Sequence, residues 1–179
     1  ATFGPSTSPA VIIYDDSLGE NWQDWSWEAT VNLSGSFPVH DGSNSANITL
    51  SAWGGFSPSL SSGATSISTS GYSDLRFWIH GGDSTKQIDV FTQDESDQSS
   101  NSVTITANGG SWKFVTVSLE SLGSPANIRR VNFFNNSNSS LSLFTLDEIQ
   151  LFPKTTTAVN RASFWNLMIP VITRQEGRE

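Results

Sequence analysis

The sequence predicts an all-β domain, a two-sheet antiparallel β-sandwich of the jelly-roll type, with an extended tail at each end. Two observations lead to this fold class. Several short segments, such as Leu75–His80, alternate apolar and polar residues with a period of two. Clusters of Gly, Asn, Ser and Asp separate these segments at the spacing typical of sandwiches. The only helical feature expected is a turn near Leu119–Leu122.

The strands are expected in chain order with short connections between them. The run 46–53 should end at Gly54-Gly55, and the runs 75–80 and 88–93 should pair as a hairpin around Gly81–Asp83. In the last run the apolar phase changes at Asp147-Glu148, which predicts a β-bulge. The expected strands are 11–14, 29–33, 46–53, 75–80, 88–93, 103–107, 112–119, 128–134 and 141–151. The residues expected in the core are Ile48, Leu50, Leu75, Phe77, Ile79, Val115, Val117 and Phe133.

The 179 residues suggest one domain between two tails. Residues 1–10 are rich in Ser, Thr and Pro and are interpreted as a linker, and residues 11–152 as the sandwich module. Residues 153–179 are interpreted as a linker plus an apolar arm, Phe164–Ile172. Because exposed apolar residues favour association, we expect this arm to pack on a neighbouring copy, as in a homo-oligomer, or on a further domain.

Composition excludes several kinds of partner. The net charge of -8 argues against nucleic acid and against anionic membrane surfaces, and no apolar run has the length of a membrane span. The absence of cysteine excludes disulfides and thiolate chemistry. The chain has no signal-peptide pattern, so we expect a mature or excised fragment of a secreted, extracellular protein. N-glycosylation sequons occur at Asn32, Asn47, Asn135 and Asn138.

The stretch Asp15–Trp27 holds three of the seven tryptophans together with several carboxylates. An indole ring offers a flat apolar face that can stack on the C–H groups of a sugar, while polar neighbours bind its hydroxyls. The alternative is that these rings pack in the core. The polar face of the expected hairpin adds further aromatic and polar candidates. The predicted carbohydrate-binding residues are Trp22, Trp25, Trp27, Trp53, Trp78, His80, Asp89, Phe91 and Gln93.

Together with the Asp15–Trp27 stretch, the segments GYSDLRFWIHGG (71–82) and TLDEIQL (145–151) resemble a known family. The region Val11–Phe152 resembles β-jelly-roll carbohydrate-binding modules with a galactose-binding-like fold, which are appended to secreted glycoside hydrolases. The resemblance implies a non-catalytic protein that binds a polysaccharide or other glycan. It also implies a structural Ca²⁺ where the first and last strands meet, although the same carboxylates could simply be solvated. The candidate metal ligands are Asp15, Asp16, Asp41 and Asp147.

Two other functions compete with glycan binding. An enzyme is disfavoured because the chain contains no nucleophile elbow, zinc-protease or phosphate-loop motif. Glycoside hydrolysis needs two carboxyl groups flanking one bond, and Asp89 and Glu95 carry no mark beyond acidity. The main alternative is a structural β-sandwich subunit of an extracellular glycoprotein assembly or filament, joined through its terminal arms.

Overall fold

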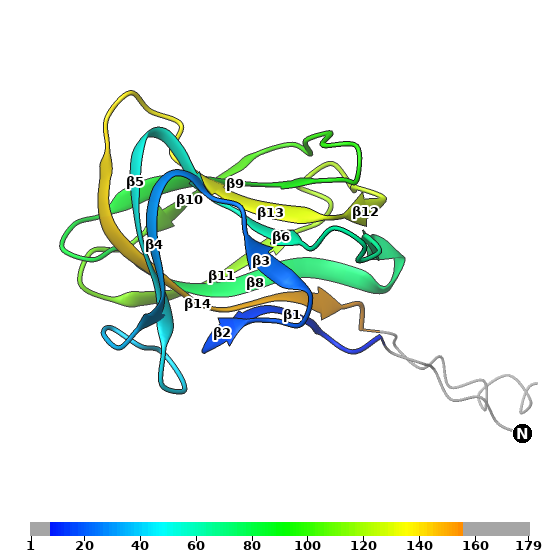
Figure 1. Ribbon diagram of the computed structural model, residues 1–179, viewed down its shortest axis with the longest axis horizontal. Helices are drawn as coiled ribbons and strands as arrows, with labels where there is room; N and C mark the ends of the chain where they lie inside the picture. Colours follow the sequence, from blue (N-terminus) through cyan, green and yellow to red (C-terminus); the bar gives the residue numbers. More distant parts are fainter. Residues whose placement is uncertain (1–7, 156–179) are drawn as a thin grey trace, which may run out of the picture.

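The computed structural model describes residues 8–155, which form an all-β domain and confirm the predicted fold class (Figure 1). A single 3₁₀ turn, η1 (Thr69–Gly71), interrupts the strands of this region. The strands are β1 (Val11–Asp15), β2 (Ser17–Leu18), β3 (Trp22–Asp24), β4 (Trp27–Gly35), β5 (Ser45–Phe56), β6 (Pro58–Leu60), β7 (Ile67–Ser68), β8 (Tyr72–His80), β9 (Lys86–Gln93), β10 (Val103–Ala107), β11 (Trp112–Ser118), β12 (Asn127–Ile128), β13 (Arg130–Phe134) and β14 (Leu141–Pro153).

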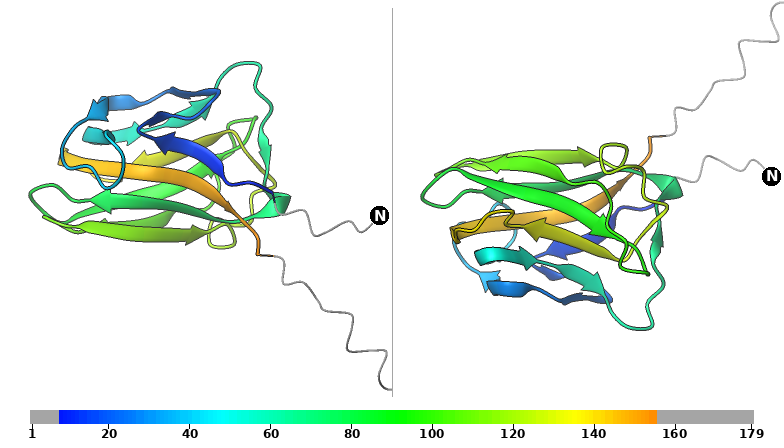
Figure 2. Two further views of the ribbon diagram at one scale, coloured as in Figure 1. Left: turned by 90° about the horizontal axis from the view of Figure 1, so that it is seen from below. Right: turned by 90° about the horizontal axis from the view of Figure 1, so that it is seen from above.

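Twelve strands form one continuous hydrogen-bonded sheet that folds into two layers packed face to face, which we call the β8–β14 sheet and the β9–β13 sheet; each view of Figure 2 looks onto one of them. β7 and β12 form a separate two-stranded sheet. In the β8–β14 sheet, β14 lies between β8 and β1, and β11 forms the edge beyond β8. In the β9–β13 sheet, β13 lies between β9 and β6, with β10 and β3 outside them. β4 and β5 bend across both sheets, because the start of β5 pairs with β14 and its end with β13.

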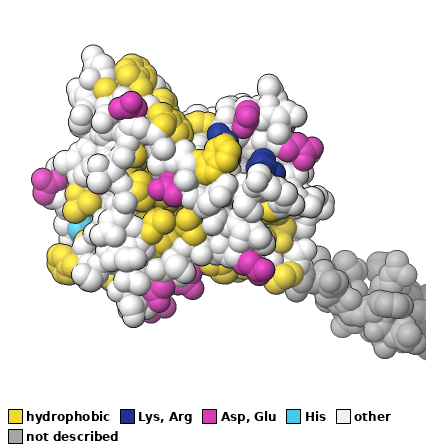
Figure 3. Space-filling model, viewed as in Figure 1, with side chains coloured by type: hydrophobic (Ala, Val, Ile, Leu, Met, Phe, Trp, Pro, Cys, Tyr) yellow, Lys and Arg dark blue, Asp and Glu magenta, His cyan; other side chains and the backbone are white. Residues whose placement is uncertain are grey.

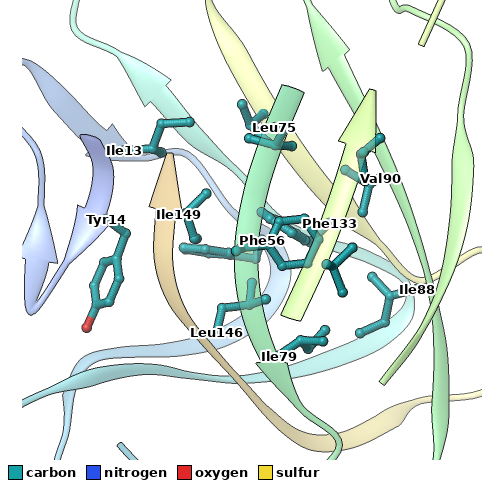
Figure 4. Packing of buried hydrophobic residues seen from close by; sticks show 14 of the residues in the cluster. Ile13, Tyr14, Phe56, Leu75, Ile79, Ile88, Val90, Phe133, Leu146 and Ile149 are labelled. Carbon is teal, nitrogen blue, oxygen red and sulfur yellow. The ribbon is translucent and has the colours of Figure 1, made fainter. Parts of the chain in front are cut away.

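The core fills the space between these sheets. All eight residues predicted to be inside are buried, which confirms that part of the sequence analysis. Figure 4 shows Phe56 and Phe133 close together in this core. The ring of Phe133 is stacked with that of Phe56 at 6.0 Å between centroids and lies edge-on to that of Phe77 at 5.1 Å. Burying one such side chain fully is worth roughly 1.5–3 kcal/mol, so this cluster dominates the stability of the fold.

The predicted hairpin between 75–80 and 88–93 is wrong. β8 pairs with β11 and β14, whereas β9 pairs with β10 and β13, so the two strands lie in opposite sheets. Each strand presents one apolar face, and these faces meet across the core instead of lying side by side. Alternation with a period of two specifies a buried face but does not distinguish these two arrangements.

Two predicted details of the strands have different outcomes. The bulge predicted at the Asp147-Glu148 step is confirmed, since the pairing of β14 with β8 shifts between Asp147 and Gln150, and Glu148 has φ +49°. The prediction that Gly54-Gly55 ends its strand is wrong, because β5 continues to Phe56.

The division into linker, module and arm stays a prediction, because most of both tails, including the segment 164–172, lies outside the described residues. Between residues 8 and 155, no helix is long and apolar enough to cross a membrane.

Candidate functional site

Three tryptophans lie with large exposed areas on the outer face of the β9–β13 sheet. Trp25 follows β3, Trp27 begins β4, and Trp53 lies in the second half of β5; their exposed fractions are 51%, 37% and 53%. In a folded domain, most of the surface of a tryptophan side chain is usually buried by other residues. Figure 3 views this surface from the side, where hydrophobic side chains lie beside Lys or Arg side chains at an indentation of the upper edge.

Strand pairing and ring contacts bring Trp27 and Trp53 together with two phenylalanines, and Trp25 lies further along β13, beside Arg130. Trp27 pairs with Gly55, Gly55 with Phe134, and Phe134 with Asp89, which places these residues in one row across four strands. The Phe134 ring lies 6.1 Å from Trp27, 6.4 Å from Trp53 and 6.1 Å from Phe91, measured between centroids. We call Trp25, Trp27, Trp53, Phe91 and Phe134 the aromatic platform.

The backbone holds Trp27 and Trp53 in fixed positions. The Trp27 ring lies flat against Gly55, where a Cβ atom would come within 2.3 Å of the indole, so only glycine fits beneath it. The Trp27 Nε1–H donates to the Trp53 carbonyl oxygen at 2.8 Å. Trp53 itself has φ +60° and lies where the pairing of β5 with β4 forms an irregular bulge: Trp27 pairs with Gly55 and Ala29 with Leu50.

A buried amide holds this bulge in place. Asn135 is 1% exposed, and its Nδ2 donates to the carbonyls of Ser51 at 2.8 Å and Ser139 at 2.7 Å. Its backbone N–H donates to the Gly54 carbonyl, and the Trp53 N–H donates to the Ser137 carbonyl at 3.1 Å. The loop after β13 therefore fixes the position of Trp53 on the platform.

Polar groups border the platform along β9 and β13. The Arg130 guanidinium lies 5.0 Å from the Trp25 ring centroid and pairs with Asp97 at 3.4 Å. Gln93 Oε1 accepts hydrogen bonds from Arg130 at 3.3 Å and from Asn132 at 3.2 Å. Asp89 accepts from the hydroxyl of Thr104 and from Asn136 Nδ2. The face thus combines flat apolar rings with charged and amide groups, as sugar binding requires.

Six of the nine predicted carbohydrate-binding residues lie on this face: Trp25, Trp27, Trp53, Asp89, Phe91 and Gln93. Three predicted residues do not join them. Trp22 is 7% exposed and belongs to the core. Trp78 and His80 lie on β8 in the other sheet, where the Trp78 ring stacks on His40 at 3.7 Å and His80 meets Trp112 edge-on.

The sequence analysis missed Arg130, Asn132 and Phe134. The alternation of β13 could have indicated them, because they share the phase opposite to Val131 and Phe133, which are buried. Asn132 is itself buried, and it accepts a hydrogen bond from Ser57 Oγ.

The predicted calcium ligands do not form one donor set. Residues 8–155 contain no group of three or more His, Cys, Asp or Glu side chains able to share a metal ion. The carboxylate of Asp16 accepts backbone N–H bonds from Asn44 and Ser43, which lower its pKa. Asp147 is fully buried and accepts from the backbone of His40, Asp41 and Glu148, and burial raises its pKa.

Asp15 and Asp41 are exposed. Calcium binding stays a prediction, which a comparison of melting temperatures with and without a chelator tests.

The four sequons differ in access. Asn32 and Asn138 are exposed, and Asn47 is half-buried and bonded to Thr145 and Phe37. Asn135 is enclosed, so the folded domain presents no amide for modification there.

Solved structures of carbohydrate-binding modules share the all-β sandwich fold of this domain. A family 29 module variant complexed with cellulohexaose has a TM-score of 0.58 at 12% identity, over 80% of this chain and 89% of that one. A variant complexed with mannohexaose gives 0.56 at 13%, over 80% and 90%. The family 11 module of the cellulosomal cellulase Lic26A-Cel5E of Clostridium thermocellum gives 0.59 at 16%, over 86% and 99%.

Residues 13–154 match the family described as expansin-like protein C-terminal domain, and the chain belongs to that family. Comparison with curated protein sequences gave no match.

Proposed function

We propose that this domain is a non-catalytic carbohydrate-binding module that acts outside the cell and holds a glycan chain across the aromatic platform. The single observation that carries the proposal is the exposure of Trp25, Trp27 and Trp53 on one face of one sheet, with polar side chains beside them. The sugar rings would stack on the indoles, and their hydroxyls would bond to Arg130 and Gln93.

A binding role is favoured over a catalytic one by how the carboxylates near the platform are engaged. Asp97 pairs with Arg130, Asp24 accepts from Ser26, and Asp89 accepts from Thr104 and Asn136. Hydrolysis of a glycosidic bond requires two carboxyl groups placed on either side of that bond. The platform is instead an open sheet face with its carboxylates at the border.

The length of the platform favours a chain over a single sugar. Arg130, beside Trp25, and Phe134, beside Trp27, are four residues apart along β13, a span of roughly 13 Å. Trp53 lies further along. Several sugar units can therefore stack at once, each adding a small increment to the affinity.

The experiment is calorimetric titration of the full chain with cellohexaose and mannohexaose, supported by affinity electrophoresis in hydroxyethylcellulose and galactomannan. Trp25→Ala and Trp53→Ala should each weaken binding by about tenfold, given a stacking contribution on the order of 1 kcal/mol plus lost contact area. The matched control is Phe114→Ala, which removes a 47% exposed ring from the opposite sheet and should bind as the parent does. Equal binding by all four proteins would show that the platform is not the site.

A further inference from the structure

A polar cavity opens beyond the platform, between the first half of β9, Thr104 of β10 and the loop that follows β13. Its volume is about 450 Å³, within the range of roughly 300–1,000 Å³ seen for small-ligand pockets. Its wall consists mainly of hydroxyl and amide side chains, among them Gln87, Thr104, Asn136 and Ser142, and contains no aromatic ring.

The cavity is continuous with the platform. Asp89, in its wall, is the cross-strand neighbour of Phe134, and Asn136 donates to the Asp89 carboxylate at 3.0 Å. Ser137, also in its wall, accepts the hydrogen bond from the backbone N–H of Trp53. A glycan that runs from Trp25 past Trp27 towards Trp53 therefore reaches the cavity next.

The charges of the cavity select against an anionic ligand. Lys86 is 5% exposed, and its ammonium already donates to the carbonyls of Gly81 and Ser84, to the Ser84 hydroxyl and to Asp83. An ammonium has only three N–H donors, so Lys86 has none left for a ligand. The Asp89 carboxylate lies in the cavity wall, and both of its hydrogen-bond partners, Thr104 and Asn136, are neutral. A uronate would meet this charge without compensation, whereas neutral hydroxyls can donate to it.

From this geometry we infer that the cavity is an end subsite that takes a terminal neutral hexose unit of the glycan, held by hydrogen bonds alone. The subsite rests on the proposed function, since without stacking on the platform nothing would bring the chain to the cavity. It predicts that affinity grows with chain length after the platform is already covered. It also predicts that the last unit is recognised by Gln87 and Asn136, not by an aromatic ring.

The test is calorimetric titration of the full chain with cellotetraose and cellohexaose, and with mannotetraose and mannohexaose. The variant carries Gln87→Ala and Asn136→Ala, both exposed residues whose loss should leave the fold intact. We expect this variant to bind the hexaoses about three- to tenfold more weakly than the parent and the tetraoses almost as well. A loss of this size corresponds to one neutral hydrogen bond or two weak ones. Gln150→Ala, on the opposite sheet, is the matched control and should bind as the parent does.

The outcomes separate the two levels of inference. If Trp27→Ala abolishes binding but the double variant binds hexaoses as the parent does, the subsite is wrong and the platform stands. If the parent binds none of the four oligosaccharides, the platform and the subsite both fall. If an oligosaccharide ending in a uronate binds more tightly than its neutral counterpart, the charge argument for the cavity is overturned.

Discussion

The indole N–H of Trp27 donates a hydrogen bond to the backbone carbonyl oxygen of Trp53 at 2.8 Å. This bond connects two rings of the platform that lie 26 residues apart in the sequence. Trp27 is the first residue of β4 and pairs with Gly55, whereas Trp53 lies in the irregular part of β5 and has no ladder partner of its own. The bond gives the bulge a fixed position relative to the sheet, so both rings are arranged before a ligand arrives.

Trp27→Phe should separate the role of Trp27 in positioning Trp53 from its role in stacking on a sugar. The substitution keeps a six-membered aromatic ring and removes the five-membered part of the indole, which carries the N–H. The Trp53 carbonyl loses its partner, so we expect stability to fall by about 1 kcal/mol and affinity for a hexaose to fall several-fold. Trp25→Phe is the control, since it shortens an exposed ring in the same way at a position where no such bond is made to Trp53. Urea unfolding and calorimetry measure the two effects. Identical losses in both variants would mean that ring size alone matters.

Asn135→Ala should weaken binding through the position of Trp53. The side chain is buried and donates to the carbonyl of Ser51 in the irregular part of β5 and to that of Ser139 in the loop after β13, so its loss leaves both groups unsatisfied. We expect a loss of roughly 1–3 kcal/mol in unfolding free energy. We also expect a lower affinity, because Trp53 loses its fixed position.

Asn138→Ala, in the same loop but exposed, is the control and should change neither quantity. A destabilised Asn135 variant with parental affinity for hexaoses, measured well below its melting temperature, would contradict the positioning role.

The sequence predicted the buried half of this domain better than the exposed half. Leu75, Phe77 and Ile79 could be placed inside because alternation with a period of two marks the face that avoids water. The same alternation says nothing about which strand lies beside which, and this is why Trp78 and His80 were expected next to Phe91. Partner choice depends on long connections and on the bends of β4 and β5, which no local pattern encodes.

Part of the aromatic platform could be predicted from the sequence, but mainly from composition and not from alternation. Trp25 and Trp27 were singled out because tryptophan is clustered there, and they do lie on the candidate face. Trp53 was assigned by strand phase, yet its position comes from the bulge that Asn135 holds, with φ +60°. Arg130 gave no compositional signal because it is one residue in an ordinary strand. Strand phase could have placed it on the outer face, but its proximity to Trp25 is seen only in the structure.

Asp16→Asn should destabilise the domain in a pH-dependent way. The carboxylate accepts backbone N–H bonds from Ser43 and Asn44 at 2.7 Å each, and its pKa in the folded state is lowered. A lowered folded pKa stabilises the protein at pH values above the unfolded pKa of about 4, and this contribution disappears as the pH falls through the folded pKa. Asparagine offers a neutral acceptor at every pH.

The difference in unfolding free energy between parent and Asp16→Asn should therefore be clear at about pH 6.5 and shrink towards about pH 3. Urea titrations at both values measure it. Asp15→Asn changes a neighbouring exposed carboxylate and serves as the control. A difference that is constant with pH would mean that asparagine disturbs the 40–44 loop sterically, with no role for the carboxylate charge.

Deletion of residues 160–179 should leave the sandwich folded. β14 ends at Pro153, after pairing with β1, β5 and β8, and among residues 8–155 the buried core already runs from Ile13 to Leu151. The deleted part contains the apolar segment Phe164–Ile172, whose exposure would favour association because each large apolar side chain is worth roughly 1.5–3 kcal/mol when buried. We therefore expect the shortened chain to keep the parental melting temperature and hexaose affinity and to lose any self-association seen by sedimentation velocity.

A control carrying polar substitutions at Phe164 and Trp165 in the full chain should reproduce the loss of association. If the deletion instead lowers the melting temperature by many degrees, the segment belongs to this domain and the boundary at residue 152 is misplaced.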